Sequence, residues 1–248
     1  MSHQANNDVL QHDREHHNRI AGEYDVWYVT KWHYQLLHEE LVSEVTRGFK
    51  PEDGLLIELG AGTGATAIPL HRKGYQVLAV DAAQGMLAKL QGNEPAIPIL
   101  CADAVQPLPL DAGCARCVLI SQALHHMSDH EAVIREAWRL LKPGGRLFIF
   151  EPQELPACLD FIRRWARRRF STGEHIDSEK PITPSRLTKQ LTDAGFVIRF
   201  RRRTFFFPFT PKSRLGRHLV KALWRIPGRV PLLSRLGGVF KVYAEKKA

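Results

Sequence analysis

Short apolar segments alternate with helical segments through the middle of this chain, and this alternation constrains the fold more than any other feature. Four apolar runs, at 55–59, 77–80, 97–101 and 117–121, are separated by longer stretches, and a fifth run at 146–150 follows a segment with helical spacing. Strands that are apolar on both sides and are joined through helices form a parallel sheet covered on both faces. The pattern therefore predicts an α/β fold.

The segments that flank this pattern extend the predicted domain. Residues 34–48 carry apolar side chains at helical spacing, so we expect a helix before the first strand. A helix at 184–194, a strand at 196–207 and a last strand at 238–244 are expected after the fifth run.

No repeat and no linker divides the chain, so we expect one main domain rather than two. The domain is predicted at residues 51–248. An N-terminal helical cap segment precedes it at 1–50, and a basic amphipathic insertion occupies 208–237.

A glycine-rich turn follows the first apolar run. Gly60, Gly62 and Gly64 stand where a strand passes into a helix, and their missing Cβ atoms let a ligand lie against the backbone. The letters also satisfy the dinucleotide pattern G-x-G-x-x-G/A, so the turn alone leaves NAD and other adenosine cofactors open. Asp81, at the end of the second run, is placed to accept hydrogen bonds from two ribose hydroxyls in either case.

Two further acids accompany this turn. Glu58 precedes the first glycine by two residues, and Asp103 follows the third apolar run. Each acid taken singly is equally well explained as a solvated carboxylate at a strand end. Three acids at the ends of three neighbouring strands favour a binding site, because the carboxyl ends of parallel strands meet at one edge of a sheet.

With its acids and glycines in this order, the chain resembles the class I S-adenosylmethionine (SAM) methyltransferases, in the small-molecule branch that includes ubiquinone- and menaquinone-biosynthesis enzymes. The resemblance covers about residues 17–152, with a weaker tail to 245, and includes motifs at 18–25, 121–127 and 139–146. It implies a Rossmann-like, doubly wound sheet of seven mostly parallel strands with an antiparallel last strand. An N-terminal helical extension and a basic insertion before the last strand complete the expected fold.

The resemblance also implies SAM as the cofactor and assigns residues to it. The glycines would pass the methionine and ribose portions, Asp81 would hold the ribose diol, and Asp103 would receive the adenine amino group. Glu58 would order the glycine turn, and Tyr24 would reach over the cofactor from the N-terminal segment. The full cofactor-binding set that it implies is Tyr24, Glu58, Gly60, Ala61, Gly62, Gly64, Asp81, Ala82, Asp103, Ala104, Ser121 and Gln122.

Methyl transfer from a sulfonium requires an acceptor held in line with the methyl carbon, so a general base is dispensable for some acceptors. Where one is needed, His125 is the best candidate, because it follows the fourth strand, where the reactive end of the cofactor is expected. His126 and His130 are weaker choices. The alternative is that the His125-His126 pair packs beside the next helix, with Asp129 as its N-cap.

The sequence predicts neither a metal site nor a membrane-spanning helix. The pair Cys114 and Cys117 lacks a second pair or histidines at zinc spacing, and Cys117 begins an apolar run typical of strand packing. No uncharged apolar stretch reaches 18 residues, and Met1 to Val9 lack a secretory pattern. We therefore expect a cytoplasmic protein.

Charge divides the chain unevenly. Residues 1–160 hold 13 Lys+Arg and 21 Asp+Glu, whereas residues 161–248 hold 22 and 5. Such a basic part commonly meets a polyanion or an anionic membrane. If residues 213–226 are helical, basic and apolar side chains fall on different faces, which favours contact with an anionic membrane surface through 199–235. The alternative is a lid whose apolar face packs on the sheet.

The expected acceptor is a small apolar or membrane-associated molecule, methylated on oxygen, nitrogen or carbon. The segment Ser121 to Leu124 lacks the Asp/Asn-Pro-Pro-aromatic run of enzymes that methylate amino groups of bases, and Cys158 follows alanine rather than proline. Two alternatives stay open. One is a tRNA or rRNA methyltransferase that uses the basic C-terminal region, and the other is a non-catalytic SAM-binding partner protein.

Overall fold

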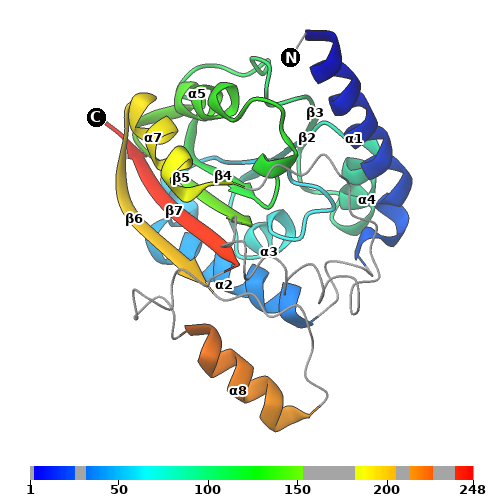
Figure 1. Cartoon of the computed structure of the whole chain (residues 1–248), viewed down its shortest axis with the longest axis vertical. Helices are drawn as coiled ribbons and strands as arrows, with labels where there is room; N and C mark the ends of the chain where they lie inside the picture. The colour runs from blue at the N-terminus through cyan, green and yellow to red at the C-terminus, as the bar shows by residue number, and fades with distance from the viewer. Residues whose placement is uncertain (1–2, 26–31, 153–181, 205–212, 226–237, 248) are drawn as a thin grey trace.

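The centre of the fold is a seven-stranded sheet with helices on both faces (Figure 1). The computed structural model describes residues 3–25, 32–152, 182–204, 213–225 and 238–247. The strands are β1 (Leu56–Leu59), β2 (Val77–Asp81), β3 (Ile99–Cys101), β4 (Ala115–Ser121), β5 (Leu141–Pro152), β6 (Phe196–Thr204) and β7 (Val239–Lys246). The helices are α1 (His3–Tyr24), α2 (Trp32–Gly48), α3 (Ala67–His71), α4 (Gln84–Asn93), α5 (His130–Leu140), α7 (Pro184–Asp193) and α8 (Arg214–Arg225), with short 3-10 turns η2 (Pro51–Asp53) and η3 (Leu124–His126).

The strand order is β3-β2-β1-β4-β5-β7-β6. Strands β1 to β5 pair in parallel, and β7 pairs antiparallel with both β5 and β6. This confirms the predicted Rossmann-like, doubly wound sheet with an antiparallel last strand. The order reverses between β1 and β4, and in such sheets the crevice beyond the carboxyl ends at this point is where ligands bind.

Two apolar clusters, one on each face, hold the sheet between its helices. Neighbouring residues Leu56 and Ile57 of β1 belong to different clusters because successive side chains of a strand point to opposite faces. The cluster with Ile57 includes buried residues of α5 and α7, and the cluster with Leu56 includes residues of α2, α3 and α4. Burial on both faces explains why the strands are almost continuously apolar in sequence.

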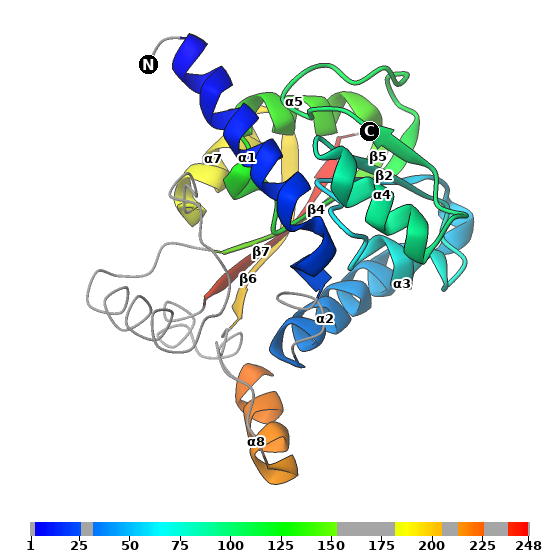
Figure 2. The same ribbon diagram turned by 90° about the vertical axis from the view of Figure 1, so that its right-hand side faces the viewer.

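Helix α1 docks on α4, as the view in Figure 2 makes clear. Ile20 and Ala21 of α1 pack against Ala83 and Met86 at the start of α4. The contact is close: the Gly85 N–H donates to Asn18 Oδ1 at 2.7 Å, and a Cβ on Gly85 would lie only 3.0 Å from that oxygen. This contact sets α1 against the carboxyl edge of the sheet.

Most expected elements are confirmed, with shifts at their ends. Strand β3 begins at Ile99 rather than at 97, since Pro98 has no N–H for the ladder. Strand β5 begins at Leu141, before the expected 146, and its register with β4 shifts between the pairs Ala115/Leu141 and Cys117/Arg146. The described part of the strand expected at 196–207 ends at Thr204, and residues 205–207 lie outside the described residues.

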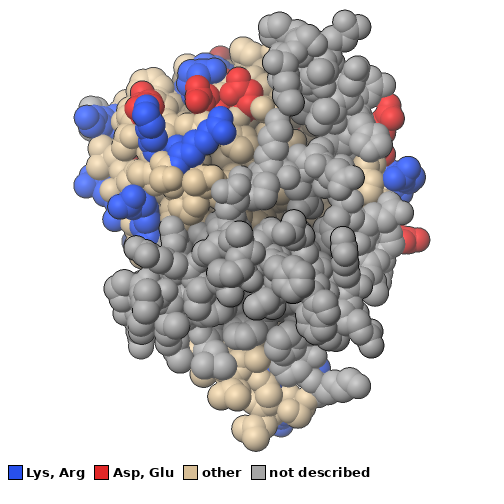
Figure 3. All heavy atoms as spheres, viewed as in Figure 1, with Lys and Arg blue, Asp and Glu red and all other residues tan. Residues whose placement is uncertain are grey.

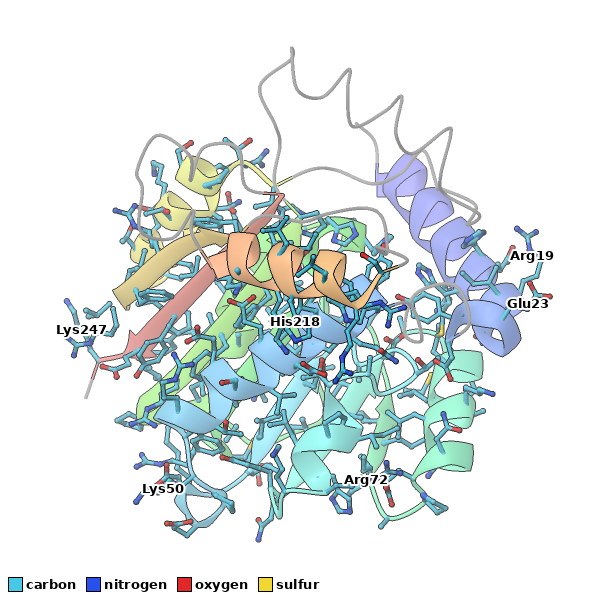
Figure 4. The ribbon with its side chains drawn as sticks, turned by 90° about the horizontal axis from the view of Figure 1, so that it is seen from below. Arg19, Glu23, Lys50, Arg72, His218 and Lys247 are labelled. Atoms are coloured by element: carbon cyan, nitrogen blue, oxygen red, sulfur yellow. The ribbon has the colours of Figure 1, made fainter. Side chains whose placement is uncertain are left out.

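Helix α8 confirms the helix expected at 213–226, and it lies apart from the sheet in Figures 1 and 2. Val220 is buried, and Lys221 is 3.8 Å from Glu39 of α2, which crosses behind α8 in Figure 4. Leu215 and Leu219 are 81% and 60% exposed. The lid alternative is therefore wrong for these two leucines, which do not pack on the sheet. None of the described helices is long and apolar enough to cross a bilayer.

Candidate functional site

A cavity of about 390 Å³ lies at the carboxyl edge of the sheet, beyond β1, β2, β3 and β4, with α1 as its outer wall. This is the crevice that the strand order predicts for a ligand. Eight of the site residues expected from the sequence line it: Tyr24, Gly60, Gly62, Asp81, Ala82, Asp103, Ala104 and Gln122.

The glycine turn approaches the cavity with backbone conformations that other residues avoid. Gly60, Gly62 and Gly64 have φ values of +76°, +53° and +87°. A Cβ on Gly60 would lie 2.2 Å from the Cβ of Ala123, whereas a Cβ on Gly62 would have no protein atom within 4 Å. Gly60 thus allows the turn to pack against the segment after β4, and Gly62 leaves room on the cavity side.

Two carboxylates mark neighbouring strand ends in the cavity wall. Asp81 accepts hydrogen bonds from the Gly62 N–H and the Ala83 N–H, both at 2.8 Å. Asp103 accepts one from the Val105 N–H at 2.9 Å. Asp81 therefore ties the glycine turn to the start of α4 and faces the cavity, and Asp103 lies one strand further along the edge.

Glu58 lies beneath the glycine turn rather than in the cavity wall. Its side chain is buried, and among the described residues its Oε2 has no hydrogen-bond partner. Burial and the nearby charge of Asp81 raise its pKa from 4.5 to about 8, while hydrogen bonds from Ala67 and Thr66 oppose this rise. The alternative of a solvated carboxylate therefore fails for this acid, which lies against the start of α3.

The remaining residues of the expected cofactor-binding set do not line the cavity, and neither does His125. Ala61 is buried, and a Cβ on Gly64 would lie 2.9 Å from Leu90 of α4. The Ser121 hydroxyl is buried and has no hydrogen-bond partner within the described part of the chain. His125 is buried, with its Nδ1 at 2.7 Å from Glu151 Oε2. Asp129 caps α5, since its Oδ1 accepts the Ala132 N–H, as the sequence predicted.

Sequence reasoning missed several residues of the cavity wall. Helix α1 contributes Arg14 and His17, and the segment after η3 contributes Met127. His126, which we considered a weaker candidate base than His125, also lines the cavity. His17 could have been predicted from its position directly before the motif at 18–25. In the described residues, no group of three or more His, Cys, Asp and Glu side chains is arranged to hold a metal ion.

The fold and the cavity together define a Rossmann-like domain that binds a nucleotide-type cofactor at the carboxyl edge of its sheet. Within this class, residues 57–149 match the family described as "Methyltransferase domain". This match confirms the predicted similarity to the SAM-dependent methyltransferases, and the similarity implies SAM as the cofactor.

Curated relatives and solved structures agree with this class. The chain is 36% identical over 128 residues to a demethylmenaquinone methyltransferase of Corynebacterium urealyticum, an alignment that covers 51% of this chain and 54% of the relative. It is 27% identical to a ubiquinone biosynthesis O-methyltransferase of Xanthomonas axonopodis, covering 69% and 74%. A SAM-dependent methyltransferase structure from Thermotoga maritima has the same fold, with a TM-score of 0.65, 18% identity and coverage of 93% and 98%. The chain spans about half the length of the demethylmenaquinone methyltransferases that it matches.

The residues present fit a SAM-type cofactor. Gly62 leaves a space that a Cβ would fill, and the carboxylates of Asp81 and Asp103 stand one strand apart along the same wall. The two carboxylates can accept hydrogen bonds from the hydroxyl and amino groups that such a cofactor carries.

Proposed function

We propose that this protein transfers a methyl group from SAM to a small, apolar or membrane-associated acceptor. The observation that carries the proposal is the cavity at the strand-order reversal, with Asp81, Asp103 and Gly62 in its wall. When bound, SAM supplies a methyl group on a positively charged sulfur. The residues of this chain hold the cofactor and the acceptor in line and exclude water, which is the main requirement of a displacement with a neutral leaving group.

The proposed arrangement of the cofactor follows the strand order. Asp103, with Ala104, holds the adenine end beyond β3, and Asp81, with Ala82, accepts hydrogen bonds from the ribose hydroxyls beyond β2. The turn from Gly60 to Gly64 surrounds the methionine and ribose portions, and Ser121 and Gln122 border the methionine end beyond β4. Tyr24 covers the cofactor from α1, and Glu58 orders the glycine turn from below.

Incubating a cell extract with the protein and isotopically labelled SAM tests the activity without a guess about the acceptor. We expect one or a few labelled products, recovered in the organic fraction and identified by mass spectrometry. Heat-denatured protein is the control. Label in RNA alone would support the RNA methyltransferase alternative, and no label in any fraction would favour a SAM-binding protein without catalysis.

Helix α8 is the proposed contact with an anionic membrane surface on the cytoplasmic face. Leu215, Leu219 and Ala222 are spaced along one exposed stripe, and Arg214 and Lys221 lie on the stripe beside it. The buried Val220 marks the side of α8 that faces the body, so the leucine stripe faces away from it, and the basic stripe lies at the flank, where Lys221 is 3.8 Å from Glu39 of α2. An interfacial helix has this arrangement, with leucines dipping below the headgroups and cations beside the phosphates.

In the face shown in Figure 3, Lys and Arg gather mainly beside Asp and Glu at the end where α5, α7 and β6 lie, whereas the visible part of α8 is mostly uncharged. The apolar stripe of α8 is therefore the feature that favours a membrane surface as the partner. Two parts of the predicted contact surface 199–235, residues 205–212 and 226–235, lie outside the described residues.

Flotation with liposomes tests the membrane contact. We expect the wild-type protein to float with vesicles of phosphatidylcholine and phosphatidylserine. The double variant Arg214→Gln/Lys221→Gln should bind about 30-fold more weakly, since each basic residue near an anionic surface contributes about 1 kcal/mol. Leu215→Ser/Leu219→Ser should also lose binding, because its apolar stripe is gone.

The matched control is Arg186→Gln/Lys189→Gln, which removes the same charge from α7 and should float like the wild type. Equal flotation of the α8 and α7 variants would contradict the proposed surface. Salt-sensitive binding to tRNA without flotation would reverse the order of membrane and RNA as partners.

A further inference from the structure

The cavity has a defined end beyond β4, away from the acidic residues. Along the edge of the sheet the wall runs from Asp103 beyond β3, through Asp81 and Gly62, to Gln122 beyond β4. After Gln122 in the chain, Ala123, His126 and Met127 also line the cavity, and ring contact with His126 places His17 of α1 beside them. If the cofactor lies as proposed above, its sulfur and the acceptor meet at this end.

Two histidine rings from different elements meet there. The centroids of His17 and His126 are 4.9 Å apart, and the rings are nearly perpendicular, at 85°. Both side chains are half-buried, and both line the cavity. An imidazole in such a position can accept a proton at neutral pH, because its ordinary pKa lies near 6.5.

A buried pair lies behind His126 and holds it in place. The ring of His125 is 4.1 Å from the ring of His126, and its Nδ1 is 2.7 Å from Glu151 Oε2. Glu151 is fully buried, and its Oε1 accepts the Ala123 N–H at 2.9 Å and the Leu124 N–H at 2.8 Å. One carboxylate of β5 therefore fixes both the turn that carries His126 and the ring that packs against it.

The turn itself has a conformation that needs such support. Gln122 has a φ of +50°, in the left-handed region that residues other than glycine rarely adopt, and its N–H donates to the Phe150 carbonyl at 2.8 Å. Backbone strain of this kind persists only where the surrounding contacts maintain it. Here the Phe150 carbonyl holds Gln122 itself, and Glu151 holds the two residues that follow it.

We propose that His126, rather than His125, accepts the proton of the methyl acceptor, and that Glu151 and His125 are its positioning residues. This inference rests on the proposed function. In the step, the acceptor's proton moves to an imidazole nitrogen of His126, whose lone pair forms the new N–H bond, and the electrons of the broken bond stay on the acceptor atom. The imidazolium later returns the proton to water.

The charges around His126 suit this role. The ring of His17 on α1 contacts it, His125 adjoins it on its own turn, and Glu151 lies behind His125; Arg14 and Tyr24 of α1 line the same cavity. Asp81 and Asp103 lie in the cavity wall further along, beyond β2 and β3. The guanidinium of Arg14 favours the deprotonated acceptor, because an anion that forms beside a cation is stabilised.

Nuclear magnetic resonance of the histidine rings tests the location of His126 without a known acceptor. The resonances of His126 are identified by their loss in His126→Asn, and its pKa is measured in complexes with S-adenosylhomocysteine, whose sulfur is neutral, and with sinefungin, which carries a cationic amine at the same place. We expect the pKa to be lower by about one unit or more with sinefungin, because a unit charge within about 6 Å has an effect of this size. The signal of His218 on α8 serves as a control.

The positioning role has its own readout. Glu151→Ala should abolish the difference between the two ligands at His126, whereas Glu151→Gln, whose amide oxygen can accept the same two N–H groups, should keep most of it. A ligand-dependent difference at His125 or His17 in place of His126, or none at any histidine while calorimetry shows the ligand bound, would overturn the inference alone. No binding of S-adenosylhomocysteine would overturn the proposed function as well.

Discussion

Replacing Asp81 with alanine is expected to weaken the binding of S-adenosylhomocysteine by at least about 100-fold, as measured by isothermal titration calorimetry. The carboxylate accepts the Gly62 and Ala83 N–H groups, each at 2.8 Å, and faces the cavity where the ribose is proposed to lie. Each hydrogen bond to a charged group contributes about 1.5–3 kcal/mol, so two ribose hydroxyls account for the expected loss.

Two variants separate the causes of this loss. Asp81→Asn keeps an acceptor oxygen but removes the charge, so we expect an intermediate loss of about 10-fold. Asp111→Ala removes an exposed carboxylate that does not line the cavity, and it should bind like the wild type. Unchanged binding by Asp81→Ala would contradict the proposed cofactor site, and binding of NADH in place of S-adenosylhomocysteine would favour the dinucleotide alternative that the glycine pattern alone leaves open.

The arrangement of the sheet and the acids was predictable because it depends on local patterns. Burial on both faces requires strands that are almost continuously apolar, so the runs ending near Leu59, Asp81 and Ser121 could be recognised from the sequence. Parallel strands end at the same edge, and this places Asp81 and Asp103 in one wall from their sequence positions alone. The conformation of the glycine turn was equally local, since positive φ values favour glycine.

The acceptor end of the cavity was not predictable in this way, because contacts distant in sequence determine it. Whether His125 or His126 faces the cavity depends on the turn after β4, and that turn is held by Glu151, which stands at the end of another strand. His17 reaches the cavity only because α1 docks on α4 through Asn18 and Gly85. Contacts of this kind, between residues far apart in the sequence, leave no periodic pattern along the chain from which they could be predicted.

The N-terminal segment shows the same limit. Residues 1–50 were predicted as a cap that precedes the domain, and this boundary stays a prediction. In the structure, Leu41 and Val45 of α2 pack in the same cluster as Leu56 of β1, and α1 supplies part of the cavity wall. An amphipathic pattern identifies the buried face of a helix but not the surface that covers it.

The protonation of Glu58 is expected to make the free energy of unfolding depend strongly on pH. Its pKa is raised from 4.5 to about 8 in the folded protein by burial and by the charge of Asp81. The folded state therefore holds a proton that the unfolded state has lost above pH 4.5. The stability that this proton provides is fully present below pH 4.5 and is lost as the pH rises through about 8. From pH 5 to pH 8.5 we expect the wild type to lose about 4 kcal/mol of unfolding free energy through this group.

Urea unfolding at pH 5, 7 and 8.5 measures this loss, with Glu58→Gln as the test variant and Glu52→Gln as the control. The amide of Glu58→Gln stays neutral, so its stability should exceed that of the wild type at pH 8.5 and approach it at pH 5. Glu52 is exposed, and its replacement should leave the wild-type profile unchanged. Parallel profiles for wild type and Glu58→Gln would show that Glu58 is already ionised in the folded protein.

Because the charge of Asp81 is one of the causes of the raised pKa of Glu58, the two experiments are linked. Asp81→Asn removes that charge, so the pH at which stability is lost should fall in this variant while Glu58 stays buried. If this pH falls and the binding of S-adenosylhomocysteine weakens in the same variant, the carboxylate of Asp81 has two roles. It binds the ribose, and its charge helps to keep Glu58 protonated. Weaker binding without any change in the pH profile would separate the two roles and leave burial as the cause of the raised pKa.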